Sequence, residues 1–512
     1  MADRSTMSES HFSRRSFLKT AGAAAGASTF FTLPRLLGQP TTIRGNDPAL
    51  QNEGPADYTF TIATTPIELA PNRIISVTNY NGQFPGPLLR LKEGERVAID
   101  IRNDTDTPEQ LHWHGQFVST DIDGAAEEGT PFIPPHGSRR ISFMPGPSGL
   151  RFYHTHVRAG ANLAMGQYSG LVGPVYIEPR QHAGDYDREV FLTLKEFQPT
   201  LSRDGDMAMD FLSPAQTVPA LKDAGESRMK ASLAKGMPHG YEVGYDSFTI
   251  NGRMLGHGEP VRVKQGERVL FHILNGSAGE IRSLALPGHS FSVVAMDGNP
   301  LPKPVRVPGL WLGTAERISA VVEMNHPGVW VMGDLDDDDR HHGMGIVVEY
   351  AGYKGRPQWL PPKPFKWNYT RFGNAGAVST KPDEVFDMIF EKQNAALQGF
   401  NRWTINGVAY PVAQMDQMMS VPSFHLREGR RYRIRMRNAS DDIHPIHLHR
   451  HSFELTKIAG QPTSGVIKDV VMVGGYQEAE IDFVANNPGL TLFHCHQQLH
   501  MDFGFMTLFD YV

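Results

Sequence analysis

The stretch QGERVLFHILN, residues 265–275, decides the fold class, because the chain holds two further copies of it. EGERVAIDIRN occupies residues 93–103, and EGRRYRIRMRN occupies residues 428–438. In each copy an asparagine follows the glycine by nine residues, and the residues between them alternate in character. A period of two is typical of half-buried β-strands. The copies therefore predict three related, strand-rich domains.

The spacing of the copies sets the domain organisation. An Asn-Gly pair precedes each copy, at Asn81, Asn251 and Asn406, and the repeat length of roughly 155 to 170 residues is too long for a solenoid unit. Among 512 residues, 51 are glycine and 37 are proline, which favours a turn-rich chain over a helical one. We therefore predict an all-β chain of three consecutive β-sandwich domains, at residues 57–180, 181–355 and 363–512.

Charge and cysteine content exclude several classes of protein. The chain has 49 Lys and Arg residues against 55 Asp and Glu residues, a net charge of −6, so it lacks the dense basic composition that a nucleic-acid partner needs. It contains one cysteine and 22 histidines. One cysteine excludes an internal disulfide, a cysteine-rich zinc site and an iron–sulfur cluster with four cysteine ligands.

The N-terminal segment has the composition of an export signal. Residues 13–19 read SRRSFLK, and a small, weakly apolar run follows from Ala21 to Leu33. This run is too short and too rich in Ala and Gly to span a bilayer, so we expect no stable membrane span. The pair Arg14-Arg15 resembles the twin-arginine signal, which implies a signal peptide at residues 1–40, the twin-arginine export machinery as a partner, and a periplasmic or secreted protein.

The histidines fall at equivalent positions of the first and third domains. Nine residues beyond the repeated asparagine, and again five residues beyond a later glycine, these domains carry His-x-His pairs, whereas the middle domain carries other residues. Side chains at i and i+2 of a strand point to the same face. Eight imidazoles, which suit Cu, Zn, Fe or Ni, therefore predict a metal cluster between these two domains. The pairs are His112 and His114, His154 and His156, His447 and His449, and His494 and His496.

The cysteine lies between two of these histidines. The same alternation places the Cys495 side chain on the face opposite to His494 and His496, and so in a different site. Its expected partners are His444 and His500. Two imidazoles and one thiolate form the trigonal blue-copper electron-transfer centre.

On these motifs the chain resembles the multicopper oxidases, and specifically their three-domain, laccase-like branch. The likeness spans residues 57–512 and rests on four motifs: His112-Trp113-His114-Gly115, His154-Thr155-His156, His444-Pro445-Ile446-His447-Leu448-His449, and His494-Cys495-His496-Gln497-Gln498-Leu499-His500. It implies three cupredoxin-like Greek-key domains. It also implies an oxidase that takes one electron from each of four substrate molecules and reduces dioxygen to two waters.

The resemblance further implies four copper ions and their ligands. The type 1 copper would be bound by His444, Cys495 and His500, and the type 2 copper by His112 and His447. Electrons would pass from the type 1 site through Cys495, which is thus both ligand and catalytic residue. The two type 3 ions would be bound by His114, His154, His156, His449, His494 and His496.

Two acids are candidates for proton delivery to dioxygen. Asp123, eleven residues after His112, matches a proton-relaying acid of the family, although Asp-Gly is also a common turn pair. Some bacterial relatives have Glu six residues after the cysteine, but this chain has Met501 there. A second proton route would therefore depend on the neighbouring Asp502.

The axial position of the type 1 site also departs from many bacterial relatives. Ten residues after Cys495, where they carry Met, stands Phe505, and Met506 would face away in a regular strand. A weak thioether ligand lowers the potential of such a site, so we expect a non-coordinating Phe505 to raise it.

The leading prediction is a laccase-like oxidase of phenols or aromatic amines. A metallo-oxidase acting on Cu(I) or Fe(II) is the alternative, which methionines at 207–209 and 415–419 support slightly, although such clusters are usually packing residues. A copper-free binding protein of the cell envelope is a third possibility, which the complete ligand set opposes. The acidic run from Asp334 to Asp339 is expected to be a solvated loop, with a cation site as the alternative. Residues 207–240 fit the strand repeat poorly and are expected to form a long loop or short helices.

Overall fold

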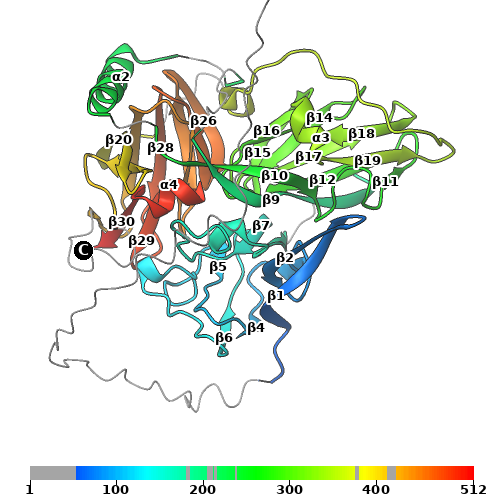
Figure 1. The fold of residues 1–512 in the computed structure, drawn as a ribbon, viewed down its shortest axis with the longest axis horizontal. Helices are drawn as coiled ribbons and strands as arrows, with labels where there is room; N and C mark the ends of the chain where they lie inside the picture. Colours follow the sequence, from blue (N-terminus) through cyan, green and yellow to red (C-terminus); the bar gives the residue numbers. More distant parts are fainter. Residues whose placement is uncertain are drawn as a thin grey trace, which may run out of the picture. The chain divides into compact units, whose positions relative to one another are not determined.

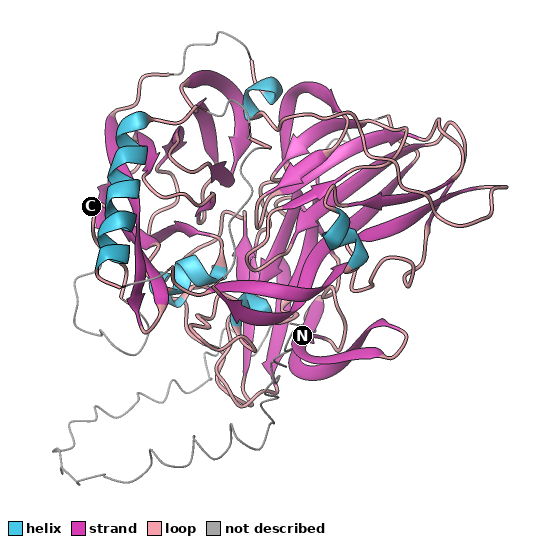
Figure 2. Cartoon of the chain, turned by 45° about the horizontal axis from the view of Figure 1, so that its top comes forward, coloured by secondary structure: helices cyan, strands magenta, loops and turns pink. Residues whose placement is uncertain are grey.

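The chain folds predominantly into β-strands, with one long helix and a few short ones (Figure 2). The structure, a computed structural model, describes residues 54–179, 185–203, 211–212, 216–236, 239–374, 380–411 and 423–512. Every sheet in these described ranges draws its strands from one of three segments, 58–178, 188–350 or 384–511. The predicted all-β class with three cupredoxin-like domains is therefore confirmed. The exact bounds 57–180, 181–355 and 363–512 stay a prediction.

The first segment forms two four-stranded sheets, in the orders β2-β1-β4-β6 and β3-β8-β7-β5 (Figure 1). Two 3₁₀ helices, η3 (Ala126–Glu128) and η4 (Gly166–Tyr168), connect strands. The strands are β1 (Tyr58–Ala70), β2 (Arg73–Tyr80), β3 (Leu89–Lys92), β4 (Val97–Asn103), β5 (His112–His114), β6 (Ser138–Phe143), β7 (Gly149–His154) and β8 (Val172–Glu178).

The second segment forms a six-stranded sheet, β10-β9-β12-β17-β14-β15, with the smaller sheets β11-β19-β18 and β13-β16. Its helices are α2 (Pro219–Ala234) and α3 (Asp337–His341). The strands are β9 (Arg188–Ser202), β10 (Glu242–Ile250), β11 (Val261–Val263), β12 (Arg268–Asn275), β13 (Arg282–Leu284), β14 (Phe291–Met296), β15 (Asn299–Val307), β16 (Leu310–Leu312), β17 (Arg317–Glu323), β18 (Val329–Gly333) and β19 (Gly345–Tyr350).

The third segment follows the 3₁₀ helix η5 (Tyr369–Phe372) and forms the sheets β21-β20-β23-β28-β25-β26 and β22-β30-β29-β24-β27. Its helix is α4 (Gln498–Asp502). The strands are β20 (Glu384–Leu397), β21 (Phe400–Ile405), β22 (Ser423–Leu426), β23 (Arg431–Asn438), β24 (His444–Leu448), β25 (Phe453–Ile458), β26 (Gln461–Lys468), β27 (Val470–Val473), β28 (Glu478–Val484), β29 (Thr491–Cys495) and β30 (Met506–Tyr511).

The three copies of the repeated stretch become β4, β12 and β23, and they occupy the same place in each domain. Each pairs in parallel with a long strand near the start of its domain and antiparallel with a later strand. In β23 the alternation buries Tyr432, Ile434 and Met436, while the arginines between them face outward. One of those arginines, Arg433, lies 2.7 Å from Asp482 of β28, so the polar face is ion-paired across strands.

The asparagine that ends each repeated stretch is buried and holds the next loop. The amide nitrogens of Asn103, Asn275 and Asn438 donate to backbone carbonyls four or five residues further on, at Thr107, Glu280 and Asp442. A buried amide needs such partners, which explains why the same residue recurs at the same distance from the glycine.

Residues 219–234 of the segment that fits the repeat poorly form helix α2, which lies beside β20 of the third segment (Figure 1). The methionines at 207–209 and 415–419 and the twin-arginine segment lie outside the described residues. Within the described ranges, no helix has both the length and the apolar character needed to cross a membrane.

Candidate metal centres

Cys495 lies with His444 and His500 in a small buried site. The sulfur is 3.7 Å from His444 Nδ1 and 3.5 Å from His500 Nδ1, and the two nitrogens are 3.2 Å apart. Pairing of β24 with β29 sets Ile446 opposite Cys495, while α4 carries His500. Burial raises the pKa of the Cys495 thiol and lowers the pKa of His444 to about 4. A buried thiolate between two neutral imidazoles fits a bound cation.

The surroundings of this site are mainly aromatic. The Trp403 ring stacks on His500 with centroids 4.0 Å apart, and Phe505 meets His444 edge-on at 4.7 Å. Ser440 Oγ lies 2.8 Å from His444 Nε2, which orients the ring so that Nδ1 faces the sulfur. Met506 lies in a separate apolar cluster with Leu492 and Leu508. Phe505 therefore lies against the site, as the family resemblance predicts for the axial residue.

The other eight histidines form a second buried group. Strand β5 pairs with β7 so that His112 faces His154, and β24 pairs with β29 so that His447 faces His494. Ligand nitrogens lie within 4.8 Å of one another in three sets. These sets are His112, His114 and His447; His114, His154 and His496; and His156, His449 and His494.

Several of the ring nitrogens that converge in this group lack hydrogen-bond partners, whereas Nε2 of His449 and Nε2 of His494 lie 3.0 Å apart. Buried nitrogens without a partner include Nε2 of His112, His154 and His447, and Nδ1 of His114. A buried polar atom without a partner is costly, so these nitrogens fit metal ions that supply the missing interaction. Burial lowers the pKa of six of these imidazoles, which favours the neutral form that binds metals. The pKa is lowered in His114, His154, His447, His449, His494 and His496.

Backbone carbonyls fix the orientation of four of the eight rings. Nδ1 of His112, His154, His447 and His494 donates to the carbonyls of Asp123, Thr155, Asp469 and Cys495, at 2.7 to 2.8 Å. His114 is reversed, because its Nε2 donates to the Asp469 carboxylate at 3.1 Å. Such outer partners select the nitrogen that is left for the metal.

In the middle domain, the positions equivalent to the His-x-His pairs belong to the hydrophobic core. Leu284 and Leu286 are buried in the apolar interior, and Ala285 bridges to Gly333 at the place where His-bearing strands pair in the other domains. The middle domain, which lacks the His-x-His pairs, therefore packs ordinary hydrophobic residues at these positions.

Asp123 lies at the cluster and is fully buried. Its Oδ2 atom is 2.9 Å from His449 Nδ1 and 3.1 Å from His112 Nδ1. Burial acts to raise the pKa of this carboxyl, but His112 holds the pKa below its ordinary value. The neighbouring Glu128 has a pKa raised well above its ordinary value by burial and by Asp123. Asp123 is therefore a contact of two cluster histidines and not only a turn residue.

The structure adds acidic and basic residues that the motifs did not indicate. Glu127 Oε2 lies 3.6 Å from His156 Nδ1, and Glu128 lies 3.5 Å from His449. Asp469 accepts from His114 and from both terminal nitrogens of Arg317 at 2.6 Å. The adjacent glutamates after Asp123 were a visible signal in the sequence. Asp469 sits in an apolar run far from any motif, so only the fold brings it to the cluster.

Asp502 is buried but does not join the cluster. It accepts hydrogen bonds from the backbone nitrogens of Ala159 and Gly160 and from Gln498 Nε2. Burial raises its pKa to about 7. Among the described residues, no hydrogen bond joins it to a histidine of either site.

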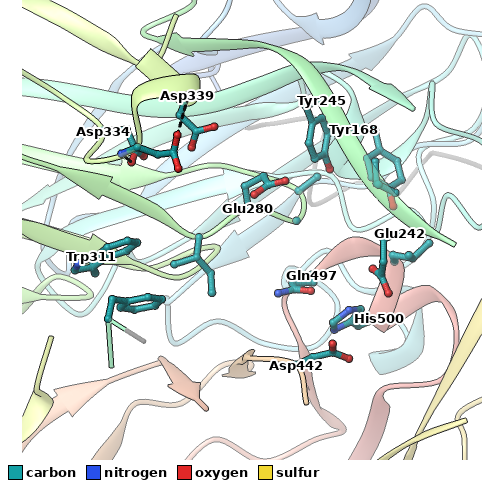
Figure 3. A pocket seen from close by; sticks show the side chains of 17 residues that line it. Tyr168, Glu242, Tyr245, Glu280, Trp311, Asp334, Asp339, Asp442, Gln497 and His500 are labelled. Carbon is teal, nitrogen blue, oxygen red and sulfur yellow. Dashed lines mark hydrogen bonds between the residues drawn. The ribbon is translucent and has the colours of Figure 1, made fainter. Parts of the chain in front are cut away.

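A cavity of about 260 Å³ opens beside His500 (Figure 3). The stacked rings of Phe211 and Trp311, 3.9 Å apart, form part of its lining. Burial raises the pKa of Glu280 to about 7 and that of Glu242 to about 8. Its acidic lining residues are Glu242, Glu280, Asp334, Asp336, Asp339 and Asp442.

The acidic run of the middle domain contributes three of these carboxylates. Asp336 caps α3, Asp334 is buried and accepts from the backbone nitrogen of Ser283, and Asp339 pairs with Arg282 at 2.6 Å. The predicted solvated loop is therefore wrong for Asp334 and Asp339, because buried partners fix both carboxylates.

Comparison with known proteins agrees with this arrangement. Family models described as multicopper oxidase match residues 61–182, 222–350 and 381–512. The chain is 28% identical over 527 residues to multicopper oxidase MmcO of Mycobacterium tuberculosis, covering 98% of this chain and 97% of the relative. It is 24% identical to laccase-4 of Thanatephorus cucumeris, covering 82% and 83%.

The fold is also similar to that of solved multicopper oxidase structures. The crystal structure of Fet3p, described as a multicopper oxidase that functions in iron import, matches with a TM-score of 0.71 and 19% identity, covering 89% of this chain and 90% of that one. Three matching domains, a Cys-His-His site and an eight-histidine group with converging, unpartnered nitrogens lead to one conclusion. The chain belongs to the multicopper oxidase family, and it is an oxidase with copper as its cofactor.

Proposed function

We propose that the protein is a laccase-like oxidase that takes electrons from a small reductant beside His500 and reduces dioxygen to water at the eight-histidine cluster. In this proposal His444, Cys495 and His500 hold the type 1 copper, and His112 and His447 hold the type 2 copper. Bound copper supplies one-electron redox chemistry and the site of dioxygen reduction. The type 3 pair is held by His114, His154, His156, His449, His494 and His496.

One observation carries the proposal: three consecutive residues reach both centres. Cys495 points to one site, while His494 and His496 point to the other. His494 Nδ1 also donates to the Cys495 carbonyl at 2.8 Å, which adds a hydrogen-bonded link to the covalent one. A short bonded path between a reductant site and an oxygen site is what an oxidase of this kind requires.

The lining of the cavity favours reductants that gain positive charge. Any neutral or cationic molecule that gives up one electron becomes more positive, and nearby carboxylates stabilise that product. An aromatic amine, whose ring can lie against Trp311, suits both the acidic and the aromatic parts of the lining. An anionic phenol is repelled by the same carboxylates.

We expect Glu280→Gln to lower kcat/KM for a p-phenylenediamine by about tenfold at pH 8, because one carboxylate is lost from the cavity. The pKa of Glu280 is about 7, so the carboxyl carries its charge above that pH and the effect should shrink at pH 6. Oxygen uptake at both pH values measures this. Glu259→Gln, at an exposed position outside the lining, is the control. The kcat/KM for a sulfonated phenol should not fall in Glu280→Gln. An equal fall in kcat/KM for both substrates would contradict the charge argument.

A metallo-oxidase is the second candidate function, and the same carboxylates favour it. Carboxylate ligands suit Fe(II) better than the soft Cu(I) ion, and either ion gains positive charge on oxidation, which the carboxylates stabilise. Steady-state oxygen uptake with Fe(II), Cu(I), the diamine and a neutral phenol on the copper-loaded protein separates the two candidates. Activity with none of them would contradict both.

Asp123 is proposed to hold and pass a proton beside the cluster. We expect Asp123→Asn to slow turnover with dioxygen by about 100-fold, because the side chain can no longer ionise. Copper content should stay at the wild-type level, since the asparagine oxygen can still accept from His449. Metal analysis and oxygen uptake test both parts, and an unchanged rate would remove the assignment. A second proton route through Asp502 stays a prediction, and the contacts of this residue favour the other role that is argued below.

Phe505 is proposed to leave the type 1 copper without an axial ligand. We expect Phe505→Met to lower the potential of this site, because a thioether can then approach the metal from the same side. A redox titration of the blue absorption measures the change. A potential that is unchanged or higher would contradict the axial assignment.

We also propose that the protein is exported to the periplasm or secreted, with the segment at residues 1–40 as the signal. The twin-arginine pattern supports this, and cell fractionation with an Arg14→Lys/Arg15→Lys variant tests it.

A further inference from the structure

Helix α4 carries more than a copper ligand. All five of its residues, Gln498 to Asp502, are buried, although a helix of this length has little stability of its own. Its position must therefore be held by contacts outside the helix. Two polar side chains on it, one at each end, supply such contacts.

Asp502 ties α4 to the loop that follows the cluster ligand His156. Its Oδ2 atom accepts from the backbone nitrogens of Ala159 at 2.9 Å and Gly160 at 2.7 Å, and its side chain is buried. A buried backbone N–H that loses its acceptor is costly, so these two hydrogen bonds hold the loop and the helix together. This loop begins three residues after His156, so the carboxylate joins the first domain to the third.

Gln498 holds the same loop at its other end. Its Oε1 accepts from the Gln167 backbone nitrogen at 2.9 Å, and its Nε2 donates to Asp502 Oδ1 at 2.9 Å. Its own backbone nitrogen donates to the carbonyl of Ala278 in the middle domain at 2.8 Å. A Cβ on Gly166 would lie 3.0 Å from the Gln498 side chain, so the loop is packed closely against this amide.

We propose that Asp502 and Gln498 form an interdomain latch that positions His500, and with it the reductant site, against the loop following His156. Both Asp502 oxygens are occupied by N–H donors from the protein, which is the arrangement of an anchor and not of a group that exchanges protons. Gln498, as an amide, has no proton to give at neutral pH. The latch itself is independent of copper, whereas its effect on the two copper sites rests on the ligand set proposed above.

The test uses the copper-loaded protein and four variants. Asp502→Ala removes the acceptor. Asp502→Asn keeps one oxygen to accept from the loop, but its NH2 group then faces the Gln498 NH2 group, so that two donors meet. The double variant Asp502→Asn/Gln498→Glu restores an acceptor opposite that amide. It loses the 3.4 Å contact to the Val157 carbonyl, which then faces a carboxylate oxygen. Asp510→Asn, on β30 and outside the latch, is the control.

The readouts are amide hydrogen exchange of residues 157–167 and the blue absorption of the type 1 site. We expect exchange in Asp502→Ala to be roughly tenfold or more faster than in the wild type, with a shifted blue band, because His500 is less well held. Asp502→Asn should be intermediate, and the double variant should return close to the wild type in both readouts.

Two results would overturn the latch. One is unchanged exchange in Asp502→Ala and Asp502→Asn with equally slow turnover in both, which identifies a proton carrier. The other is failure of the double variant to recover what Asp502→Asn loses, a comparison that remains available if Asp502→Ala does not fold. A wild-type protein without blue absorption would instead contradict the proposed type 1 ligands. Hydrogen exchange of residues 157–167 would still test the latch, because the latch does not depend on copper.

Discussion

We expect Cys495→Ser to abolish the blue colour of the copper-loaded protein and to lower turnover more than about 100-fold, because losing even an outer partner of a metal ligand costs about 10- to 100-fold. The colour arises from charge transfer between thiolate and copper, and serine offers no thiolate. Cys495 is the one cysteine of the chain, so no other side chain can replace it. Visible absorption and oxygen uptake measure these two effects, and metal analysis measures the copper that remains.

Copper at the eight-histidine cluster should remain in this variant. The serine keeps the backbone that directs His494 and His496 to the cluster, and the unpartnered nitrogens there are untouched. Met506→Leu is a suitable control, since it removes a nearby buried sulfur that lies outside the site and conserves volume. A blue Cys495→Ser protein would contradict the type 1 assignment.

Asp469→Ala should destabilise the protein by about 3–5 kcal/mol, because it leaves buried arginine charge without its partner. Asp469 makes two contacts of 2.6 Å with Arg317 and one of 3.4 Å with Arg151, and all three side chains are fully buried. Asp297 remains as a second acid near Arg317, at 3.7 Å, and cannot neutralise both arginines. Chemical denaturation measures the loss.

The same variant should also lose copper from the cluster. Asp469 fixes His114 through Nε2, and its backbone carbonyl receives His447 Nδ1, so two ligands depend on its position. Asp482→Ala is the matched control, since Asp482 is a buried partner of Arg431 and Arg433 but contacts no cluster histidine. It should destabilise the third domain with copper retained. A stability loss below about 1 kcal/mol in Asp469→Ala would contradict the role given to this network.

Local pattern was sufficient for much of the fold. Strand alternation is a property of a few consecutive residues, so the repeated stretch identified β4, β12 and β23 and the three-domain organisation before any contact was known. The parity of a strand also separated Cys495 from its neighbours, and the structure places Cys495 with His444 and His500 and apart from His494 and His496. Local pattern failed at Asp334 and Asp339, where the partners that bury them come from β13, some 50 residues away.

The sequence by itself determined the fold class, the family resemblance and the histidine and cysteine groupings, because each depends on periodicity and spacing within one segment. Only the tertiary structure decided which acids serve the cluster, what lines the cavity beside His500 and how α4 is held. Asp469, Glu128, Glu280 and the Asp502 latch all act across domains, between residues far apart in the chain. Their chemistry depends on distance, burial and charge in three dimensions, which no local pattern of residues encodes.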